Sequence, residues 1–256
     1  MICPKCGAEQ KEERQECLRC GVIFAKLAAS EVHPAPAGDE PAAKPDSTAR
    51  EKTGPEKIGR FEALLVGSDK EENPFVWGGR VLVYLVIFIW GWKFIVTPMA
   101  SDYFAQTFLH NVNLAFHEAG HVFFALFGEF IGILGGTLAQ ILMPLVCLGA
   151  FLFCRNPFAA SVALWWIGES FMDIAPYIND ARALSIPLVG GNIGLDNPDM
   201  HDWHHLLRDL GMLKYDHTLA SLSNRVGVLL MIVSFAWGAY VLYRQYKTMR
   251  WGRLSE

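Results

Sequence analysis

Beyond residue 80 the sequence is dominated by apolar stretches of membrane length. Of the 48 Asp, Glu, Lys and Arg residues, 26 fall within the first 80 positions, so the remaining 176 residues are strongly depleted in charge. A spanning helix needs about 20 mostly apolar residues. Such stretches lie at about 80–98, 103–127, 130–153, 158–180 and 225–243. They lack the alternation of a β-barrel, so the sequence predicts an all-α polytopic membrane protein with about five spans.

The polar N-terminal segment carries four of the six cysteines, in two Cys-x2-Cys pairs that are each followed by glycine. This segment has no apolar core behind a basic start, so it is not a secretory signal peptide. We expect it to stay in the reducing cytosol, where disulfides are rare. Two such pairs ten residues apart predict one tetrahedral Zn²⁺ site. Residues 1–27 resemble a short zinc ribbon, with ligands Cys3, Cys6, Cys17 and Cys20.

Residues 28–79 are expected to form a flexible linker, because 31–58 are rich in Pro, Ala and charge and have almost no large apolar side chains. The predicted core then covers 80–243 and includes a polar loop at 181–224, and residues 244–256 form a basic tail. The net charge of −4 gives no signal for a polyanion. Nucleic acid is therefore not an expected partner, whereas the lipid bilayer and a protein partner of the ribbon are.

The orientation can be tested against the rule that cytosolic loops are rich in Lys and Arg. With a cytosolic N-terminus and five spans, the second and fourth spans run back toward the cytosol and the loop 181–224 is cytosolic. Arg182, Arg208, Lys214 and Arg225 agree with that prediction. Five spans place the basic tail outside, against the rule. Either one apolar segment is re-entrant or the tail violates the rule.

His117, Glu118 and His121 form an H-E-x-x-H motif within the second predicted span. On a helix the two histidines are one turn apart and point from the same face, which suits two imidazoles on one Zn²⁺. Glu118 lies about 100° around the helix, where it can deprotonate a water and hand the proton to a leaving amine. This pattern is the zincin motif of metalloproteases, and ionisable groups inside a membrane are functional by default.

A catalytic zinc keeps three protein ligands and one open position, so a third ligand has to come from elsewhere. The metzincin arrangement fails, because Phe124 and Phe127 stand where it needs Gly and His. The better source is the end of the fourth predicted span, which contains Glu169, Asp173 and Asp180.

A membrane-embedded H-E-x-x-H followed by an acid at the end of a later span resembles the site-2 protease family of intramembrane zinc proteases. In that family the second motif runs Asn-x-x-Pro-x-x-x-Leu-Asp-Gly, and its Asp is the third ligand. The matching stretch here is Asp173-Ile-Ala-Pro176-Tyr-Ile-Asn-Asp180-Ala. Asp173 replaces the Asn, the interval from Pro to Asp is one residue shorter, and Ala181 replaces the Gly. The resemblance covers roughly residues 103–182.

That resemblance implies Asp180 as the third ligand, and the missing N–H of Pro176 is expected to kink the helix so that Asp180 turns toward the metal. Asp173, one turn before the proline, is then expected to orient a histidine or to bind substrate backbone. The chain is thus predicted to be an intramembrane zinc metallopeptidase with one catalytic and one structural Zn²⁺. Its expected substrate is a membrane protein, and its expected location is the bacterial inner (cell) membrane.

Two alternatives stay open at this point. The spacing His201-x-x-His204-His205, together with His117 and His121, resembles the histidine boxes of membrane di-iron desaturases and hydroxylases, which act on lipids. That chemistry needs about eight nitrogen ligands and a third box that the chain lacks. His201 and His204 are otherwise solvated or contribute to zinc gating or substrate contact. The other alternative is a catalytically inert membrane scaffold that binds metal.

Overall fold

The structure, a computed structural model, describes residues 65–67, 73–189, 191 and 193–252. The predicted ribbon (1–27) and most of the predicted linker lie outside these residues. The described part of the chain is helical, and its one β pairing is an isolated antiparallel bridge between Pro187 and Ile193. The all-helical prediction is therefore confirmed for the described residues.

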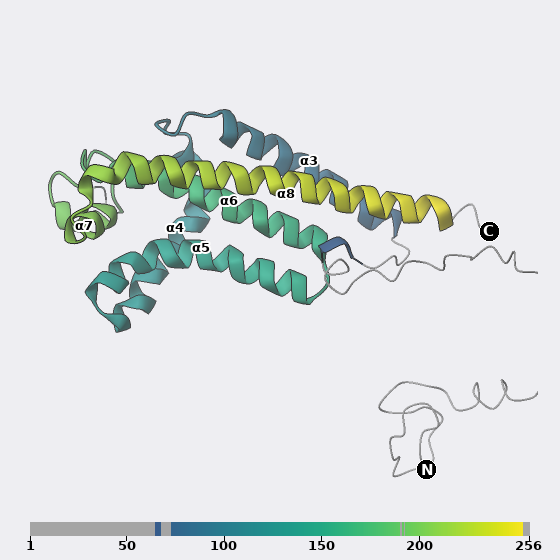
Figure 1. Cartoon of the computed structure of the whole chain (residues 1–256), viewed down its shortest axis with the longest axis horizontal. Coiled ribbons are helices and arrows are strands. Elements are labelled where there is room, and N and C mark those ends of the chain that lie inside the picture. Colours follow the sequence, from purple (N-terminus) through teal and green to yellow (C-terminus); the bar gives the residue numbers. More distant parts are fainter. Residues whose placement is uncertain (1–64, 68–72, 190, 192, 253–256) are drawn as a thin grey trace, which may run out of the picture. The chain divides into compact units, whose positions relative to one another are not determined.

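Five long helices make up the body of the protein (Figure 1). They are α3 (Pro74–Val96), α4 (Phe108–Phe124), α5 (Glu129–Phe153), α6 (Pro157–Asn179) and α8 (Asp216–Gly252). The short helix α7 (Asp202–Asp209) precedes α8. Four 3-10 turns complete the described structure: η1 (Phe104–Gln106), η2 (Ala125–Phe127), η3 (Pro198–Met200) and η4 (Leu213–Tyr215).

Three of these helical segments are long and apolar enough to cross a membrane: α3, α5 and the segment Leu213–Met249, which contains most of α8. Two of the five predicted spans are not among them. Helix α4 has only 17 residues, and α6 carries Glu169 and Asp173 in its interior. By length and composition, the structure thus supports three spans where the sequence predicts about five.

Several boundaries differ from the predicted ones. Helix α3 begins at Pro74, inside the predicted linker, because the Asn73 side chain accepts a hydrogen bond from the Phe75 N–H (2.9 Å) and Pro74 suits the first helical turn. Helix α8 begins at Asp216 and continues to Gly252. It therefore includes the last part of the predicted loop 181–224 and most of the predicted tail.

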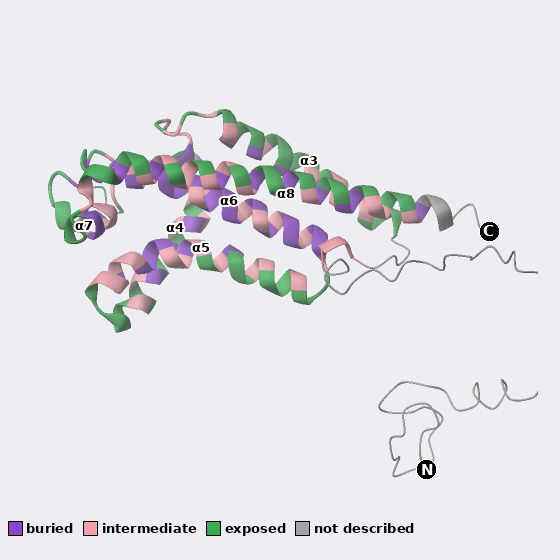
Figure 2. Ribbon diagram, in the orientation of Figure 1, coloured by how far each residue is buried: buried purple, intermediate pink, exposed green. Residues whose placement is uncertain are grey.

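Helix α6 is the central helix of the body. Figure 2 shows its buried residues along most of its length, whereas α3 is largely exposed. It packs against α8 in the antiparallel sense, because Ser234 Oγ donates to Ser161 O and Ser223 Oγ donates to Phe171 O, both at 2.7 Å. Since neighbouring helices cover it, α6 can hold acidic side chains that a lipid-facing helix could not.

Residues 97–107 turn the chain back between α3 and α4. The Trp90 indole N–H donates to the Tyr103 hydroxyl at 3.1 Å, and the rings of Phe94 and Phe104 lie 5.6 Å apart. Helix α4 therefore starts beside the last turns of α3. It then packs antiparallel to α5, with His117 beside Gln140 and His121 beside Gly132.

Candidate metal centre

Helix α4 brings the two motif histidines together, as the H-E-x-x-H spacing predicts. The Thr107 side chain caps the start of the helix by accepting from His110 N–H at 3.1 Å. His117 and His121 then stand one turn apart, with ring centroids 4.9 Å from each other. His117 is buried, and His121 is partly buried.

Asp202 is the third member of the group, and sequence reasoning missed it. One of its carboxylate oxygens lies 2.9 Å from His117 Nε2 and 3.2 Å from His121 Nε2. The three residues each offer a ligand atom, and these atoms all lie within 4.8 Å of one another. Among the described residues this is the one group of three or more potential ligands that meets that limit.

Asp202 is held in place through its backbone and its neighbours. Its N–H donates to the Tyr177 hydroxyl at 3.0 Å, which ties the start of α7 to the last turn of α6. The Tyr177 ring lies 4.2 Å from the fully buried ring of His201. His201 also caps α7, because its Nδ1 accepts from the His204 N–H at 3.2 Å. The hydrogen bond to Tyr177 and the packing of the preceding residue His201 therefore hold Asp202 in position.

Asp180, the expected third ligand, lies elsewhere in the structure. Its two carboxylate oxygens accept from Ser185 N–H (3.1 Å), Ser185 Oγ (2.7 Å) and Ile186 N–H (3.0 Å), so they close the turn that follows α6. Helix α6 continues through Pro176 to Asn179, so Asp180 stands directly after its last residue. The structure thus brings Asp202, and not Asp180, to the histidine pair.

The other ring nitrogens indicate the tautomer of both histidines. His117 Nδ1 lies 3.3 Å from Gln140 Oε1, and His121 Nδ1 lies 3.0 Å from Gly132 O. Both partners are acceptors, so each Nδ1 carries a hydrogen, and in a neutral imidazole Nε2 then presents a lone pair. The amide of Gln140 is oriented by its Nε2, which donates to Asp173 at 2.9 Å. We therefore assign both histidines the tautomer that suits a ligand binding through Nε2.

The carboxyl group of Asp202 is ionised at neutral pH. Burial raises its pKa, but hydrogen bonds and charge from the two neighbouring imidazoles lower it by more, to about 2, and the contact with Asp202 raises the pKa of His121 to about 9. Without a metal, His121 therefore carries a proton at neutral pH. Without that proton, two Nε2 lone pairs and one carboxylate oxygen would converge on a single point. Such an arrangement repels itself unless a proton or a metal cation stands between the three atoms.

Gly136 on α5 leaves room at that point. A Cβ at this position would lie 2.5 Å from His117 Nε2 and 2.6 Å from His121 Nε2. On the facing side, a Cβ at Gly120 would collide with Gly135 O, so α4 and α5 are in close backbone contact here. The glycines of α4 and α5 at this contact therefore allow the two helices to pack closely.

We expect Gly136→Ala to abolish metal binding at the His117–His121–Asp202 group. The added methyl group would occupy the space beside both Nε2 atoms, where a metal would have to lie. Gly149→Ala in the same helix is the matched control, because a Cβ there meets no atom within 4 Å. The metal content of the two purified variants measures the difference. An unchanged metal content in Gly136→Ala would contradict this geometry.

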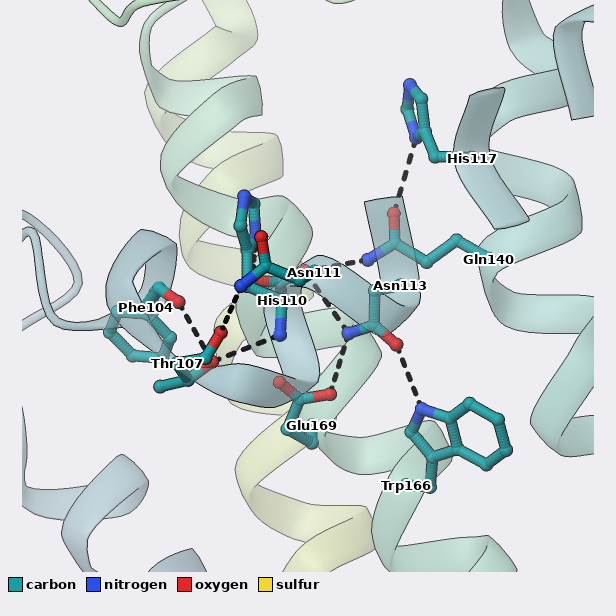
Figure 3. A network of polar contacts seen from close by, with 10 residues as sticks. Phe104, Thr107, His110, Asn111, Asn113, His117, Gln140, Trp166 and Glu169 are labelled. Atoms are coloured by element: carbon teal, nitrogen blue, oxygen red, sulfur yellow. Dashed lines mark hydrogen bonds and ion pairs between the residues drawn. The ribbon is translucent and has the colours of Figure 1, made fainter. Parts of the chain in front are cut away.

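A buried polar network lies next to the histidine pair (Figure 3). Asp173 accepts from Gln140 Nε2 at 2.9 Å and Asn113 Nδ2 at 3.2 Å, and its other oxygen lies 2.8 Å from His110 Nδ1. Asn113 also donates to Glu169 at 2.8 Å and accepts from the Trp166 indole at 2.9 Å. Through Gln140, this network orients His117, which agrees with the expectation that Asp173 supports a ligand instead of binding the metal.

The remaining candidates lie around the group without joining it. The Glu118 side chain is exposed and makes no hydrogen bond or ion pair with any residue that the structure describes. His204 Nδ1 lies 2.7 Å from Ala181 O, which ties α7 to the segment after α6, whereas His205 Nε2 lies 3.2 Å from Asp209 of the same helix. His201 lies 3.4 Å from Asp180. His201 and His204 thus help to fix the helix that carries Asp202.

Comparisons of this chain with protein families, with curated proteins and with solved structures find no match. The site offers two nitrogen ligands and one oxygen ligand, with a free carboxylate on the residue after the first histidine.

Proposed function

We propose that this protein is a membrane zinc metalloprotease whose catalytic Zn²⁺ is held by His117, His121 and Asp202. The observation that carries the proposal is the convergence of three ligand atoms within 4.8 Å of one another, with both imidazoles in the tautomer that binds through Nε2. A bond length of 2.0–2.1 Å in a tetrahedral zinc site puts ligand atoms about 3.3 Å apart. The distances of 2.9 and 3.2 Å from Asp202 to the histidines are close to that value.

The donor set suits a catalytic site more than a structural one. Three protein ligands leave one coordination position open, as catalytic zinc sites do, whereas structural sites have four protein ligands. Zn²⁺ supplies a Lewis acid that polarises the scissile carbonyl and lowers the pKa of the attacking water. Glu118 accepts the proton of that water on a carboxylate oxygen and passes it to the nitrogen of the leaving amine. Its exposed, unpartnered side chain is available for this transfer.

The surroundings of the site support a substrate in or near the membrane. Helices α3, α5 and α8 are apolar enough to span a bilayer. We propose α6 as a fourth membrane helix, because its neighbours shield it and its polar residues face the interior of the bundle. Helical backbone hydrogen bonds shield a scissile carbonyl, so a transmembrane substrate has to unwind before it is cleaved. The ribbon at residues 1–27 remains a proposed second zinc site on the cytosolic side.

The di-iron alternative finds little support in the site. Histidine-box enzymes need about eight nitrogen ligands around two irons. Here His201 caps α7, His204 ties it to Ala181 O, and His205 pairs with Asp209 of the same helix. Glu118 would have no role in such an enzyme. We therefore propose hydrolysis of peptide bonds and not oxidation of lipids.

Metal analysis of the full-length protein tests this proposal. We expect two zinc equivalents, one in the ribbon and one in the core. His121→Ala should lower the zinc content by one equivalent, and the double change Cys3→Ser with Cys6→Ser should remove the other. The two losses should be independent, because the proposed ligand sets share no residue. Iron in the core would favour the oxygenase, and a zinc content that His121→Ala leaves unchanged would contradict the proposed site.

A further inference from the structure

From the directions of the helices, we infer that the metal centre lies on the side of the membrane opposite to both ends of the helical body, which are residues 73 and 252. With the N-terminus in the cytosol, the proposed protease then cleaves segments that are exposed on the extracytoplasmic side. This statement about substrates depends on the proposed function, whereas the orientation itself does not.

The helical body has two ends that its contacts define. At the end where α3 starts, the Trp77 indole donates to Leu242 O at 3.1 Å, and Phe158 packs with Val241 and Leu242. We call this the termini end, because α3 and α6 begin and α8 finishes there. At the other end, Ile178 of α6 packs with Ala220 of α8.

The metal centre lies at that other end. Asp202 is bound to Tyr177 in the last turn of α6, and His121 lies against Gly132 in the first turn of α5. Helix α5 starts here and finishes at the termini end, where residues 154–156 connect it directly to α6. We call this end the metal end.

Helix α4 does not add a crossing. Residues 97–107 are too few to cross a bilayer, which takes about 20 residues as a helix. They turn back so that Phe104 lies against Phe94. Helix α4 then packs antiparallel to α5, so it runs toward the metal end, the same direction as α3. Four crossings remain, by α3, α5, α6 and α8, and an even number puts both ends of the body on the same side.

The basic residues agree with a cytosolic termini end. Residues 73–83, 150–160 and 240–252 lie at this end, and they contain no Asp or Glu. They contain Arg80, Arg155, Arg244, Lys247 and Arg250. The rule that cytosolic segments are rich in Lys and Arg therefore places this end in the cytosol.

At the metal end two of the basic side chains are paired with acids. Arg182 lies 2.7 Å from the buried Asp216, and Arg208 forms an ion pair with Asp199. This topology removes the conflict that five spans create, because the basic tail now shares the cytosol with the N-terminus. It also reverses the expected position of the loop 181–224, which becomes extracytoplasmic.

The centre also lies near the border of the membrane. Trp203, next to the ligand Asp202, packs beside Ala220 and Leu219. These residues precede the long apolar stretch of α8, which begins at about residue 225. The expected cleavage site is therefore a peptide bond near the extracytoplasmic end of the substrate's transmembrane helix, or just outside it. We do not expect cleavage at the centre of the bilayer.

Labelling of cysteines in right-side-out bacterial spheroplasts tests the orientation. The native Cys154 is exposed and lies at the termini end. Leu195→Cys introduces a second reporter in the loop 181–224, at a residue whose exposed fraction is 62%. A membrane-impermeant maleimide is added before or after permeabilisation. Mass spectrometry of the digested full-length protein then identifies the labelled peptide, so the ribbon cysteines can stay in place.

We expect the cysteine at position 195 to react in intact spheroplasts and Cys154 to react only after permeabilisation. The opposite pattern would overturn the inference, and so would labelling of both residues from the same side. The outcome does not depend on catalysis. An inactive protein with the expected labelling would refute the proposed protease activity and support the orientation. An active protein with inverted labelling would support the protease activity and overturn the orientation.

Discussion

Glu118→Gln is expected to abolish peptide-bond hydrolysis while the core zinc stays bound. Proton transfer by a positioned side chain contributes about 10²–10⁴-fold to a rate, so a loss of this size is expected in the turnover of a fluorescent single-span peptide that the wild type cleaves. The substitution keeps the size of the side chain. The exposed Glu118 has no partner among the described residues, so the fold should not change.

Glu129→Gln is the matched control for this prediction. Glu129 lies at the start of α5, its side chain is 82% exposed, and its nearest ion-pair atom is 4.0 Å away. It should keep both its metal and its activity. Near-normal turnover in Glu118→Gln would end the mechanism proposed here. A wild type that holds zinc and cleaves no peptide would identify the protein as an inert metal-binding scaffold.

The local part of the site could be predicted from the sequence, because helix geometry alone places His117 and His121 on one face. Asp202 could not be predicted in this way. It is 81 residues from His121 in the sequence, on an eight-residue helix, and its position depends on the contacts of Tyr177 and His201. The run His201-x-x-His204-His205 favours a prediction of imidazole ligands, whereas the residue that joins the histidine pair is the acid after His201.

The difference in the second predicted span has its origin in packing. The apolar run 103–127 has the length of a span, but the contact of Phe104 with Phe94 folds its first residues back and leaves a short α4. Composition and local propensity carry no information on such contacts, which decide where a helix starts.

The third ligand gives the second large expected effect: Asp202→Asn should remove the core zinc, and Asp180→Asn should leave it bound. Both substitutions keep the shape of the side chain and replace a carboxylate by a neutral amide, which is a weaker zinc ligand. Loss of an outer partner of a ligand typically lowers metal affinity about 10–100-fold. Loss of the ligand itself should exceed about 100-fold, and a competition titration with a zinc chelator measures the difference.

Asp180→Asn is an informative control because its carboxylate is engaged in a different structure. The amide oxygen of Asn can still accept both hydrogen bonds from Ser185, whereas the bond from the Ile186 N–H, which goes to the other oxygen of Asp180, is lost. The turn after α6 should therefore persist through Ser185. Thermal unfolding of both variants in detergent checks that the body is intact. If Asp180→Asn loses the zinc and Asp202→Asn keeps it, the ligand is the acid that the site-2 protease pattern predicts. In that case α6 has to bend at Pro176 when it binds the metal.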